Sequence, residues 1–213
     1  PGEAIPSEVE LASRFKVSQG TVRKAIDDLA AENILVRRQG KGTFVSTHDE
    51  EHSQYRFLRI VEVTGKKEKP VSHVLYVQRG KADSVAAEQL DIKRGAPVVM
   101  LRRLLRFSGE PVILDDICLP AGPFKGLSEA MINEYDGTLY SLYESRYGTR
   151  IIRAEERIQA IAADEAGAQL LEVPVNTPLL DIERVAYTYG DSPVEWRVSR
   201  CNTRHHCYLN ELG

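Results

Sequence analysis

Apolar residues recur at helical spacing in two short segments at the start of the chain. The first segment begins after Ser7, whose pairing with Glu10 is the signature of a capping box, and ends near Lys16. The second begins after Ser18, a residue type that caps helices. The apolar faces contain Val9, Leu11, Ala12 and Phe15 in the first segment and Val22, Ala25, Ile26 and Leu29 in the second. Two short helices joined by about three residues predict a helix-turn-helix.

Two β-prone runs follow the second predicted helix. Ile34-Leu35-Val36 and Thr43-Phe44-Val45 are separated by a basic segment with two glycines, Arg37 to Gly42. Glycines between two such runs favour a hairpin, so this region predicts a winged helix. Such a unit can place its second helix in the major groove of duplex DNA and its hairpin tip against a phosphate backbone.

The larger part of the chain contains an internal repeat with a period of 81 residues. Each copy predicts a short helix, then a strand, a hairpin turn and another strand. The helices are expected at Ser84–Leu90 and Glu165–Leu171, the strands at Val98–Phe107 and Leu179–Tyr189, and the turns at Ser108–Pro111 and Gly190–Pro193. Two such halves predict an α+β domain with a shared, mainly antiparallel sheet. Between them, Asp136–Tyr143 predicts a capped helix with an exposed N-terminus, and a pocket between the halves is expected.

The polar stretch Thr47–Gln54 lies between these two regions and has no periodicity. Composition and charge sign both change there, so we expect a winged helix in residues 1–47, a linker in 48–55 and a second domain in 56–213. The alternative is a solvated loop inside a single domain.

Charge is distributed unevenly along the chain. Residues 14–48 contain seven Lys and Arg against three acidic residues, a net charge of +4. Residues 49–213 contain 21 Lys and Arg against 25 acidic residues, a net charge of −4. A basic segment on an acidic body fits a small polyanion-binding module carried by another domain, although a solvated basic face would give the same count.

Several function classes find no support in the sequence. No apolar run approaches the ~20 residues that span a bilayer, and no basic-then-apolar leader opens the chain. Three scattered cysteines, Cys118, Cys201 and Cys207, favour a reducing cytoplasm. The order Cys201, His205, His206, Cys207 does not match zinc-ligand spacing, so we expect no metal and no cofactor. No nucleophile triad, P-loop or dinucleotide fingerprint is present, and no enzyme is predicted.

The first region resembles the GntR-type bacterial transcription factors. The matching residues are Pro6-Ser7-Glu8, Leu11-Ala12, Val17-Ser18, Thr21-Val22-Arg23, Ala25, Leu29 and Arg38 to Val45. The resemblance implies contacts with double-stranded operator DNA by Ser7, Ser18, Gln19, Thr21, Arg23, Lys24, Arg38, Gly40, Lys41 and Gly42. Gln19 departs from the arginine usual in the family, and can bond an adenine edge but adds no charge. The family pattern also begins with a helix before the positions of Pro1 and Gly2, so we expect this winged helix to lack its first helix.

The second region, about residues 56–211, resembles the UTRA effector domain of the HutC subgroup, which has a chorismate-lyase-like fold. The resemblance implies an effector site formed by Arg103, Asp115, Thr138, Tyr140, Glu195 and Cys201. Two residues depart from the members that bind sugar phosphates: Leu105 replaces a second arginine, and Cys201 replaces a tyrosine.

Together the two resemblances imply a transcriptional repressor that binds palindromic DNA as a homodimer and responds to a small anionic metabolite. The alternative is a lyase-type enzyme, or a ligand-binding protein, of the chorismate-lyase-like fold.

Overall fold

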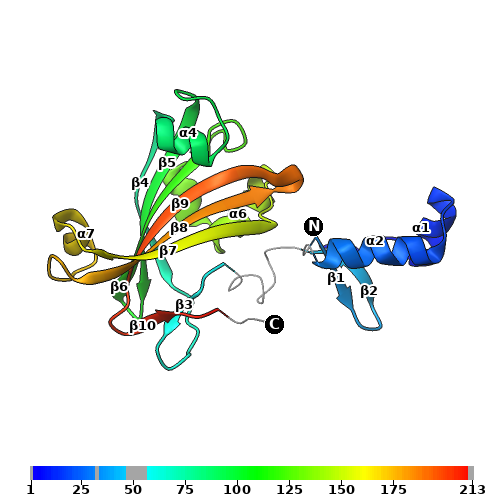
Figure 1. Ribbon diagram of the computed structural model, residues 1–213, viewed down its shortest axis with the longest axis horizontal. Coiled ribbons are helices and arrows are strands. Elements are labelled where there is room, and N and C mark those ends of the chain that lie inside the picture. The colour runs from blue at the N-terminus through cyan, green and yellow to red at the C-terminus, as the bar shows by residue number, and fades with distance from the viewer. Residues whose placement is uncertain (1, 32–33, 47–56, 211–213) are drawn as a thin grey trace.

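The start of the chain folds into two helices and a hairpin, as the sequence predicts (Figure 1). The computed structural model describes residues 2–31, 34–46 and 57–210. The elements of this first part are helices α1 (Glu8–Phe15) and α2 (Gln19–Ala31) and strands β1 (Leu35–Arg38) and β2 (Gly42–Val45). Backbone groups of the N-terminal residues add to the hairpin, because the N–H of Ile5 donates to the Thr43 carbonyl at 2.9 Å. The predicted linker, residues 48–55, lies outside the described residues.

Both predicted helix caps are confirmed. The N–H of Glu10 donates to Ser7 Oγ at 3.3 Å, and the N–H of Ser7 donates to the Glu10 carboxylate at 2.8 Å, which completes the capping box. At the start of α2, Ser18 Oγ accepts the N–H of Thr21 at 3.1 Å. Each cap satisfies a helix N–H group that has no partner within the helix.

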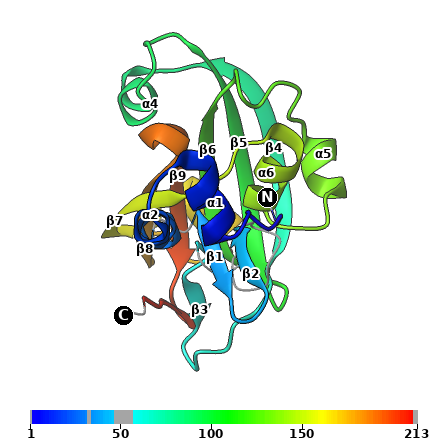
Figure 2. The same cartoon turned by 90° about the vertical axis from the view of Figure 1, so that its right-hand side faces the viewer.

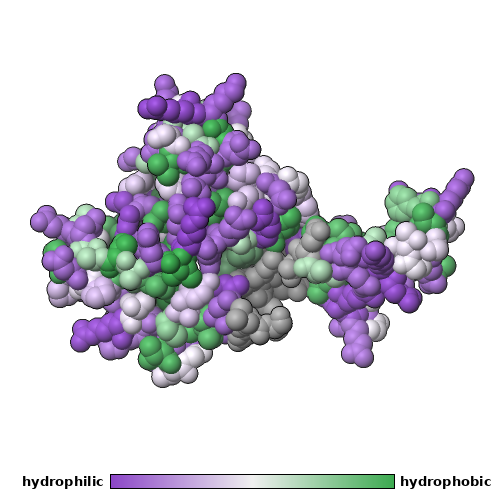
Figure 3. Space-filling view, in the orientation of Figure 1, coloured by the Kyte–Doolittle hydropathy of each residue, from purple (hydrophilic) through white to green (hydrophobic). Residues whose placement is uncertain are grey.

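The core of the winged helix is small. Val22, Ile26 and Leu35 are buried, and Leu11 packs against them. The apolar face predicted for the first helix is covered only in part, because Val9 and Phe15 are 63% and 64% exposed. Figure 3 shows apolar surface at the outer end of this unit, over α1.

The larger part of the chain is built on a six-stranded antiparallel sheet with the strand order β4-β5-β6-β9-β8-β7. The strands are β4 (Val71–Lys81), β5 (Pro97–Phe107), β6 (Glu110–Pro120), β7 (Arg153–Ala162), β8 (Pro178–Thr188) and β9 (Ser192–Asn202). A second small sheet pairs β3 (Ile60–Glu62) with β10 (His206–Tyr208). The predicted α+β class is therefore correct.

The predicted repeat is visible in the topology. Strands β4, β5 and β6 form one half of the sheet and β7, β8 and β9 the other, with β6 and β9 paired at the centre. Each half carries a short helix, α4 (Ser84–Gln89) or α7 (Glu165–Leu170), after its first strand. Asp83 and Asp164 cap these helices by accepting backbone N–H groups at 2.8 and 2.6 Å. The same local sequence thus produces the same local structure twice.

Helices α5 (Glu129–Glu134) and α6 (Leu139–Tyr147) lie on one side of the sheet (Figure 2). Helix α6 is buried along most of its length, and Leu142 and Tyr143 pack with Leu101 and Ile117 of the sheet. The helix begins at the predicted Thr138 region and ends at Gly148, whose positive φ of 62° suits a residue without a side chain. Within the described residues, no helix is long and apolar enough to cross a bilayer.

The larger domain contacts the winged helix near the end of α6. Arg150 is 3% exposed, and its Nη1 donates to the carbonyl of Ile34 at 3.3 Å. Ile34 immediately precedes β1, so the contact joins the base of the wing to the loop that follows α6.

The packing of α6 on the sheet yields a stability prediction. Leu101 is 1% exposed between these elements, and Leu101→Ala should lower the free energy of unfolding by about 2–5 kcal/mol in urea titrations. Met100, the neighbouring residue, points to the other face and is 41% exposed, so Met100→Ala should change it by less than about 0.5 kcal/mol. Equal losses in the two variants would contradict the assigned faces of β5.

Candidate functional site

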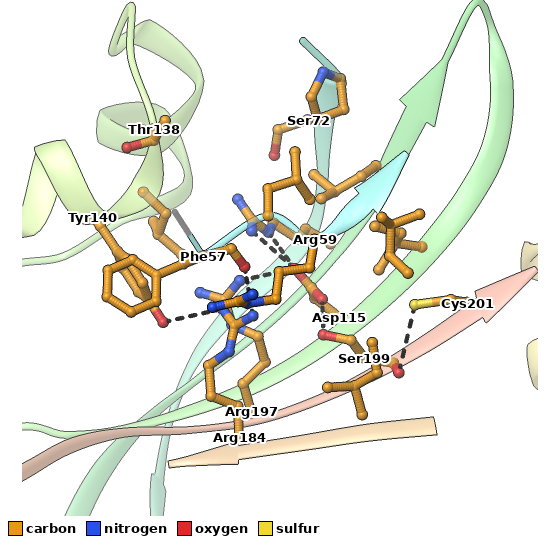
Figure 4. A pocket seen from close by; sticks show the side chains of 18 of the residues that line it. Phe57, Arg59, Ser72, Asp115, Thr138, Tyr140, Arg184, Arg197, Ser199 and Cys201 are labelled. Atoms are coloured by element: carbon orange, nitrogen blue, oxygen red, sulfur yellow. Dashed lines mark hydrogen bonds and ion pairs between the residues drawn. The ribbon is translucent and has the colours of Figure 1, made fainter. Parts of the chain in front are cut away.

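A cavity of about 130 Å³ lies between the central strands of the sheet, the N-terminal end of α6 and the segment 57–60 (Figure 4). Its walls include side chains from β5, β6, β8 and β9 and the aromatic rings of Phe57 and Tyr140. The predicted pocket therefore exists, and it lies where the two halves of the sheet meet.

The sheet register aligns the polar side chains that face this cavity. Arg103 on β5 pairs with Asp115 on β6, which pairs with Ser199 on β9. Because alternate residues of a strand face opposite sides, the neighbours of these residues point away from the cavity. On that opposite face, Arg102 and Arg200 both donate to Asp116, at 2.6 and 2.8 Å. Arg103 therefore faces the cavity, and Arg102 lies on the opposite face of the sheet.

Asp115 is the centre of the first cluster and is 1% exposed. Its Oδ2 accepts Nε of Arg103 at 2.8 Å and Nη1 of Arg197 at 3.3 Å, and its Oδ1 accepts the Ser199 hydroxyl at 2.6 Å. Burial on its own would raise the pKa of Asp115, but the charges of Arg197 and Arg103 outweigh burial and lower that pKa below its usual value. Asp115 is therefore ionised at neutral pH despite having almost no access to water.

Glu195 lies beneath the cavity floor and is fully buried. Its carboxylate accepts the hydroxyls of Tyr140 at 2.7 Å and Tyr143 at 3.0 Å, and both Nε and Nη2 of Arg197 at 2.9 and 2.8 Å. Burial, together with the charge of Glu195, raises the pKa of Tyr140 to about 12, which keeps the phenol protonated as a donor. Glu195 therefore orients side chains that face the cavity instead of lining it.

Arg184 connects the sheet to the segment that precedes β3. Its Nε donates to Glu156 at 2.7 Å, its Nη2 donates to Glu156 and to the carbonyl of Phe57, and its Nη1 donates to the Tyr140 hydroxyl at 3.5 Å. The Phe57 ring packs edge-on against Tyr140 with 5.2 Å between the ring centroids. Figure 4 shows Phe57 beside Tyr140.

The buried charges around the cavity balance one another. Three cations, Arg103, Arg184 and Arg197, pair with three carboxylates, those of Asp115, Glu156 and Glu195. Ionised groups in a low-dielectric interior are tolerated only when they are paired and hydrogen-bonded in this way. The cavity therefore has polar walls with little excess charge at its floor.

The N-terminal end of α6 forms the polar rim of the cavity. Thr138 Oγ1 accepts the N–H of Ser141 at 3.1 Å and caps the helix. Lys69 and Arg59 also line this cavity, and Lys69 lies 3.4 Å from Asp136 with both side chains largely exposed. Backbone dipoles and nearby cations favour an anionic group at such a helix end.

Five of the six predicted effector residues surround this one cavity: Arg103, Asp115, Thr138, Tyr140 and Cys201. The sixth, Glu195, supports them from below, and binding of an effector by any of them stays a prediction. Sequence reasoning did not select Arg184, Phe57 or Ser199. The repeat did contain a signal for Arg184, because it lies 81 residues after Arg103 and occupies the matching strand of the second half.

The winged helix presents the predicted DNA-contacting residues mostly on exposed surface, but two of its arginines are paired with acids. Arg23 lies 2.9 Å from Glu8, and Arg37 lies 2.7 Å from Asp27. Counting the acids before residue 14, residues 1–48 hold seven basic and six acidic residues, a net charge of +1. The basic excess of this unit is therefore confined to parts of its surface.

The hairpin tip has the open geometry that its glycines predict. Gly40 and Gly42 adopt φ values of 71° and 110°, which disfavour residues with side chains. The guanidinium of Arg38 lies over the Phe44 ring, with 4.7 Å between Cζ and the ring centroid. Ser7, predicted to contact DNA, uses its hydroxyl in the α1 capping box, where it lies 2.8 Å from the Glu10 carboxylate. DNA contacts by the predicted residues stay a prediction.

The cysteine and histidine residues near the C-terminus are separated by the fold. Cys201 is buried in the cavity wall, whereas His206 and Cys207 belong to β10. Residues 2–31, 34–46 and 57–210 contain no group of three or more His, Cys, Asp or Glu placed to hold a metal ion.

Comparison with known proteins gives two family matches. Residues 1–45 match bacterial regulatory proteins of the gntR family, and residues 65–206 match the UTRA domain. The HTH-type transcriptional regulator Rv0792c of Mycobacterium tuberculosis is 34% identical over 91% of this chain and 72% of its own length. The HTH-type transcriptional repressor PhnF of Mycolicibacterium smegmatis is 30% identical over 93% of this chain and 80% of its own.

Solved structures give the same picture. A ligand-binding domain from a GntR-family regulator candidate of Bordetella bronchiseptica superposes with a TM-score of 0.71 and 36% identity, covering 75% of this chain and 99% of that one. The crystal structure of PhnF from Mycobacterium smegmatis superposes with a TM-score of 0.62 and 26% identity, covering 100% and 92%. The two relatives named above are a transcriptional regulator and a transcriptional repressor.

The buried Asp115 cluster yields a pH-dependence prediction. The folded-state pKa of Asp115 is lowered, so its ionised form stabilises the fold above the unfolded pKa of about 3.9, and this contribution is lost as the pH falls through the folded pKa. Asp115→Asn should lower the free energy of unfolding by about 3–5 kcal/mol at pH 7, because Arg103 and Arg197 lose a buried partner.

Urea unfolding of the wild type and of Asp115→Asn between pH 7 and pH 2.5 provides the measurement. The difference in free energy of unfolding between the wild type and Asp115→Asn should stay constant down to about pH 4 and then shrink. Asp116→Asn, on the more exposed opposite face, is the matched control and should lose less stability. A difference for Asp115→Asn that does not change over the whole range would contradict the account.

Proposed function

The chain belongs to the gntR family of bacterial regulatory proteins, in the HutC subgroup with a C-terminal UTRA domain, and on this premise we propose that it is a repressor controlled by a small molecule. Members of this family regulate transcription, and relatives of this chain include a repressor. The observation that carries the proposal is one chain that combines a winged helix with a cavity built on buried, fully paired charges. Operator DNA lies in the cytoplasm, where the protein would act.

Helix α2 and the hairpin tip form the proposed DNA surface. The first five residues of α2 expose Gln19, Thr21 and Arg23, the positions from which a recognition helix reaches base edges in the major groove. Lys41 at the glycine-flanked tip can approach a phosphate and release a counterion. Arg23 would exchange its contact with Glu8 for one with DNA, so the carboxylate holds the guanidinium in place until DNA binds.

A single winged helix covers one half-site, so we propose that a homodimer binds a palindromic operator. Two copies related by a two-fold axis would place their recognition helices about one duplex turn, roughly 34 Å, apart. The larger domain is the proposed dimer contact, because it has the greater surface. A small molecule that changes the relative placement of the two larger domains then changes how well both helices reach DNA.

The proposed effector is a small anion held in the cavity. Helix α6 offers its N-terminal end, Arg103 lies in the wall, and Lys69 stands at the rim. These groups favour a carboxylate or phosphate. The family resemblance supports the same location.

The segment 57–60 is the proposed connection between the cavity and the winged helix. Phe57 follows the last residue of β2, Val45, by twelve positions, and its carbonyl accepts Arg184 while its ring packs on Tyr140. A ligand that contacts Arg184 or Tyr140 therefore also contacts the groups that hold the chain leading to the DNA-binding unit. Differential affinity of the ligand for two arrangements of this segment would supply a coupling of about 1–3 kcal/mol.

Arg23→Ala tests the DNA surface. It should weaken binding to an operator, selected from a random inverted-repeat library, by about 5- to 150-fold at physiological salt, because a groove contact is lost. Fluorescence anisotropy measures the effect. Arg106→Ala removes a partly exposed arginine from the larger domain, where it pairs with Glu172, and should leave DNA affinity unchanged. If the wild-type chain prefers no inverted repeat, or if both variants bind alike, the assignment of α2 fails.

Phe57→Ala tests the coupling. In the presence of a ligand found by thermal-shift screening of metabolites, the variant should still bind ligand but its operator affinity should respond less than half as strongly in free energy, because the ring that links Tyr140 to the interdomain segment is gone. Val63→Ala removes methyl groups from a 61% exposed side chain just after β3 and should respond like the wild type. A full response in Phe57→Ala would place the coupling elsewhere.

A further inference from the structure

The two ends of the cavity differ in chemistry. The end near α6 has hydroxyl and cationic groups, namely Lys69, Ser72, Arg103 and Thr138. The other end is formed by apolar side chains that belong to a buried cluster, namely Leu105, Ile113, Ile182 and Cys201, with Leu58 and Tyr208 packed against them. Figure 4 shows Thr138 and Cys201 on opposite sides of the cavity. A ligand that fills the cavity therefore meets a polar and an apolar wall.

The three buried arginines differ in whether a whole guanidinium nitrogen is left without a partner among the described residues. All three nitrogens of Arg197 are engaged, two by Glu195 and one by Asp115. Those of Arg184 bond to Glu156, Phe57 and Tyr140. Arg103 uses Nε and Nη2 on Asp115, and among the described residues its Nη1 has no hydrogen-bond partner. The Arg103 side chain is 90% buried in the cavity wall, so it offers one pre-oriented charged group to a ligand.

The acceptors of the cavity are closed to a ligand with many hydroxyls. Asp115 is 1% exposed and already accepts three side chains, and Glu195 is fully buried. At the apolar end, burial raises the pKa of the Cys201 thiol and keeps it neutral, and the Tyr208 hydroxyl already donates to Glu156. Hydroxyls placed there would lose their hydrogen bonds to water without replacement.

The size of the cavity limits the size of the whole ligand, its acid group included. A cavity of about 130 Å³ is slightly smaller than the roughly 150 Å³ that holds a benzene ring in a protein core. One ring with its acid group, or a carboxylic acid of about four to five carbons, would fill it.

We propose that the effector is a small monoanionic acid with a compact apolar body, and not a sugar phosphate. The acid group bonds Arg103 Nη1 at the N-terminal end of α6, and the apolar body lies over Leu105, Ile113 and Cys201. This inference rests on the proposed function, since it names the ligand class of the same pocket.

Titration of the full chain with simple probes tests the ligand class. The probes are acetate, butanoate, pentanoate and benzoate, with benzyl alcohol as the uncharged match of benzoate and glucose 6-phosphate as the polyhydroxylated anion. Calorimetry should show affinity rising about fourfold per methylene from acetate to pentanoate, as each added group enters the apolar end. Benzoate should bind at least tenfold more tightly than benzyl alcohol or glucose 6-phosphate.

Three variants assign the two ends of the cavity. Arg103→Gln should weaken the binding of benzoate at least tenfold and leave the binding of benzyl alcohol unchanged. Leu105→Arg should weaken the binding of benzoate and strengthen the binding of glucose 6-phosphate. Met100 lies on the same strand and is exposed, so Met100→Arg should change the binding of neither probe. Should Leu105→Arg fail to fold, as judged by its melting temperature, Cys201→Ser is the smaller change and should weaken pentanoate and benzoate several-fold.

The results that overturn the ligand class are distinct from those that overturn the proposed function. Glucose 6-phosphate binding as tightly as benzoate, affinity that does not rise along the carboxylate series, or no binding by any probe would each refute the apolar-acid assignment. The proposed function is judged separately by operator binding and by its Arg23→Ala variant, and it would stand if a ligand of another class controlled DNA affinity.

Discussion

The larger domain depends on a set of buried ion pairs that cross the centre of its sheet. Asp115 holds Arg103 and Arg197, and Glu195 holds Arg197 together with two tyrosine hydroxyls. Each of these charges would be costly in isolation, so the arrangement is stable only as a complete network. The network fixes the orientation of the side chains that face the cavity, and it does so before any ligand arrives. Preorganised groups of this kind bind a ligand without the entropic cost of ordering them.

The pseudo-symmetry of the fold explains why the network lies where it does. Each half of the sheet supplies an arginine from its second strand, Arg103 from β5 and Arg184 from β8. The pairing of β6 with β9 brings the two halves together, and Asp115 and Arg197 meet across that junction. The cavity therefore lies where β6 of one repeat pairs with β9 of the other. Arg184 also donates to the backbone carbonyl of Phe57, so a residue of the cavity wall contacts the segment that leads to the winged helix.

Local patterns predicted most of the fold because local physics decides those elements. The caps at Ser7, Ser18 and Asp83 are set by side chains within three residues of the N–H groups that they accept. The repeat predicted two matching strand–helix–hairpin units for the same reason. The exposure of Val9 and Phe15 could not be predicted, because a periodic apolar face does not reveal what packs on it. Pairing of Arg23 with Glu8 also escaped prediction, since it joins two helices across fifteen positions.

The candidate site was predictable only in part. Resemblance to a family pointed to residues of the cavity wall, whereas Phe57 and Ser199 became visible only through the sheet register and the path of the segment before β3. That Glu195 supports the wall from below, where a pocket acid was expected, depends on the depth of the sheet, which a strand pattern does not encode. Charge counting had a similar limit, because the acids that precede residue 14 reduce the net charge of the winged helix to +1.

The central claim is that the cavity and the DNA surface are thermodynamically coupled. Linkage requires that the factor by which ligand changes operator affinity equal the factor by which operator changes ligand affinity. The most direct measurement is the dissociation constant of the ligand for the free protein and for the protein saturated with operator DNA. We predict that the dissociation constant of the ligand changes by about 5- to 150-fold, by the same factor as the DNA affinity. An identical ligand affinity in the two states would contradict it.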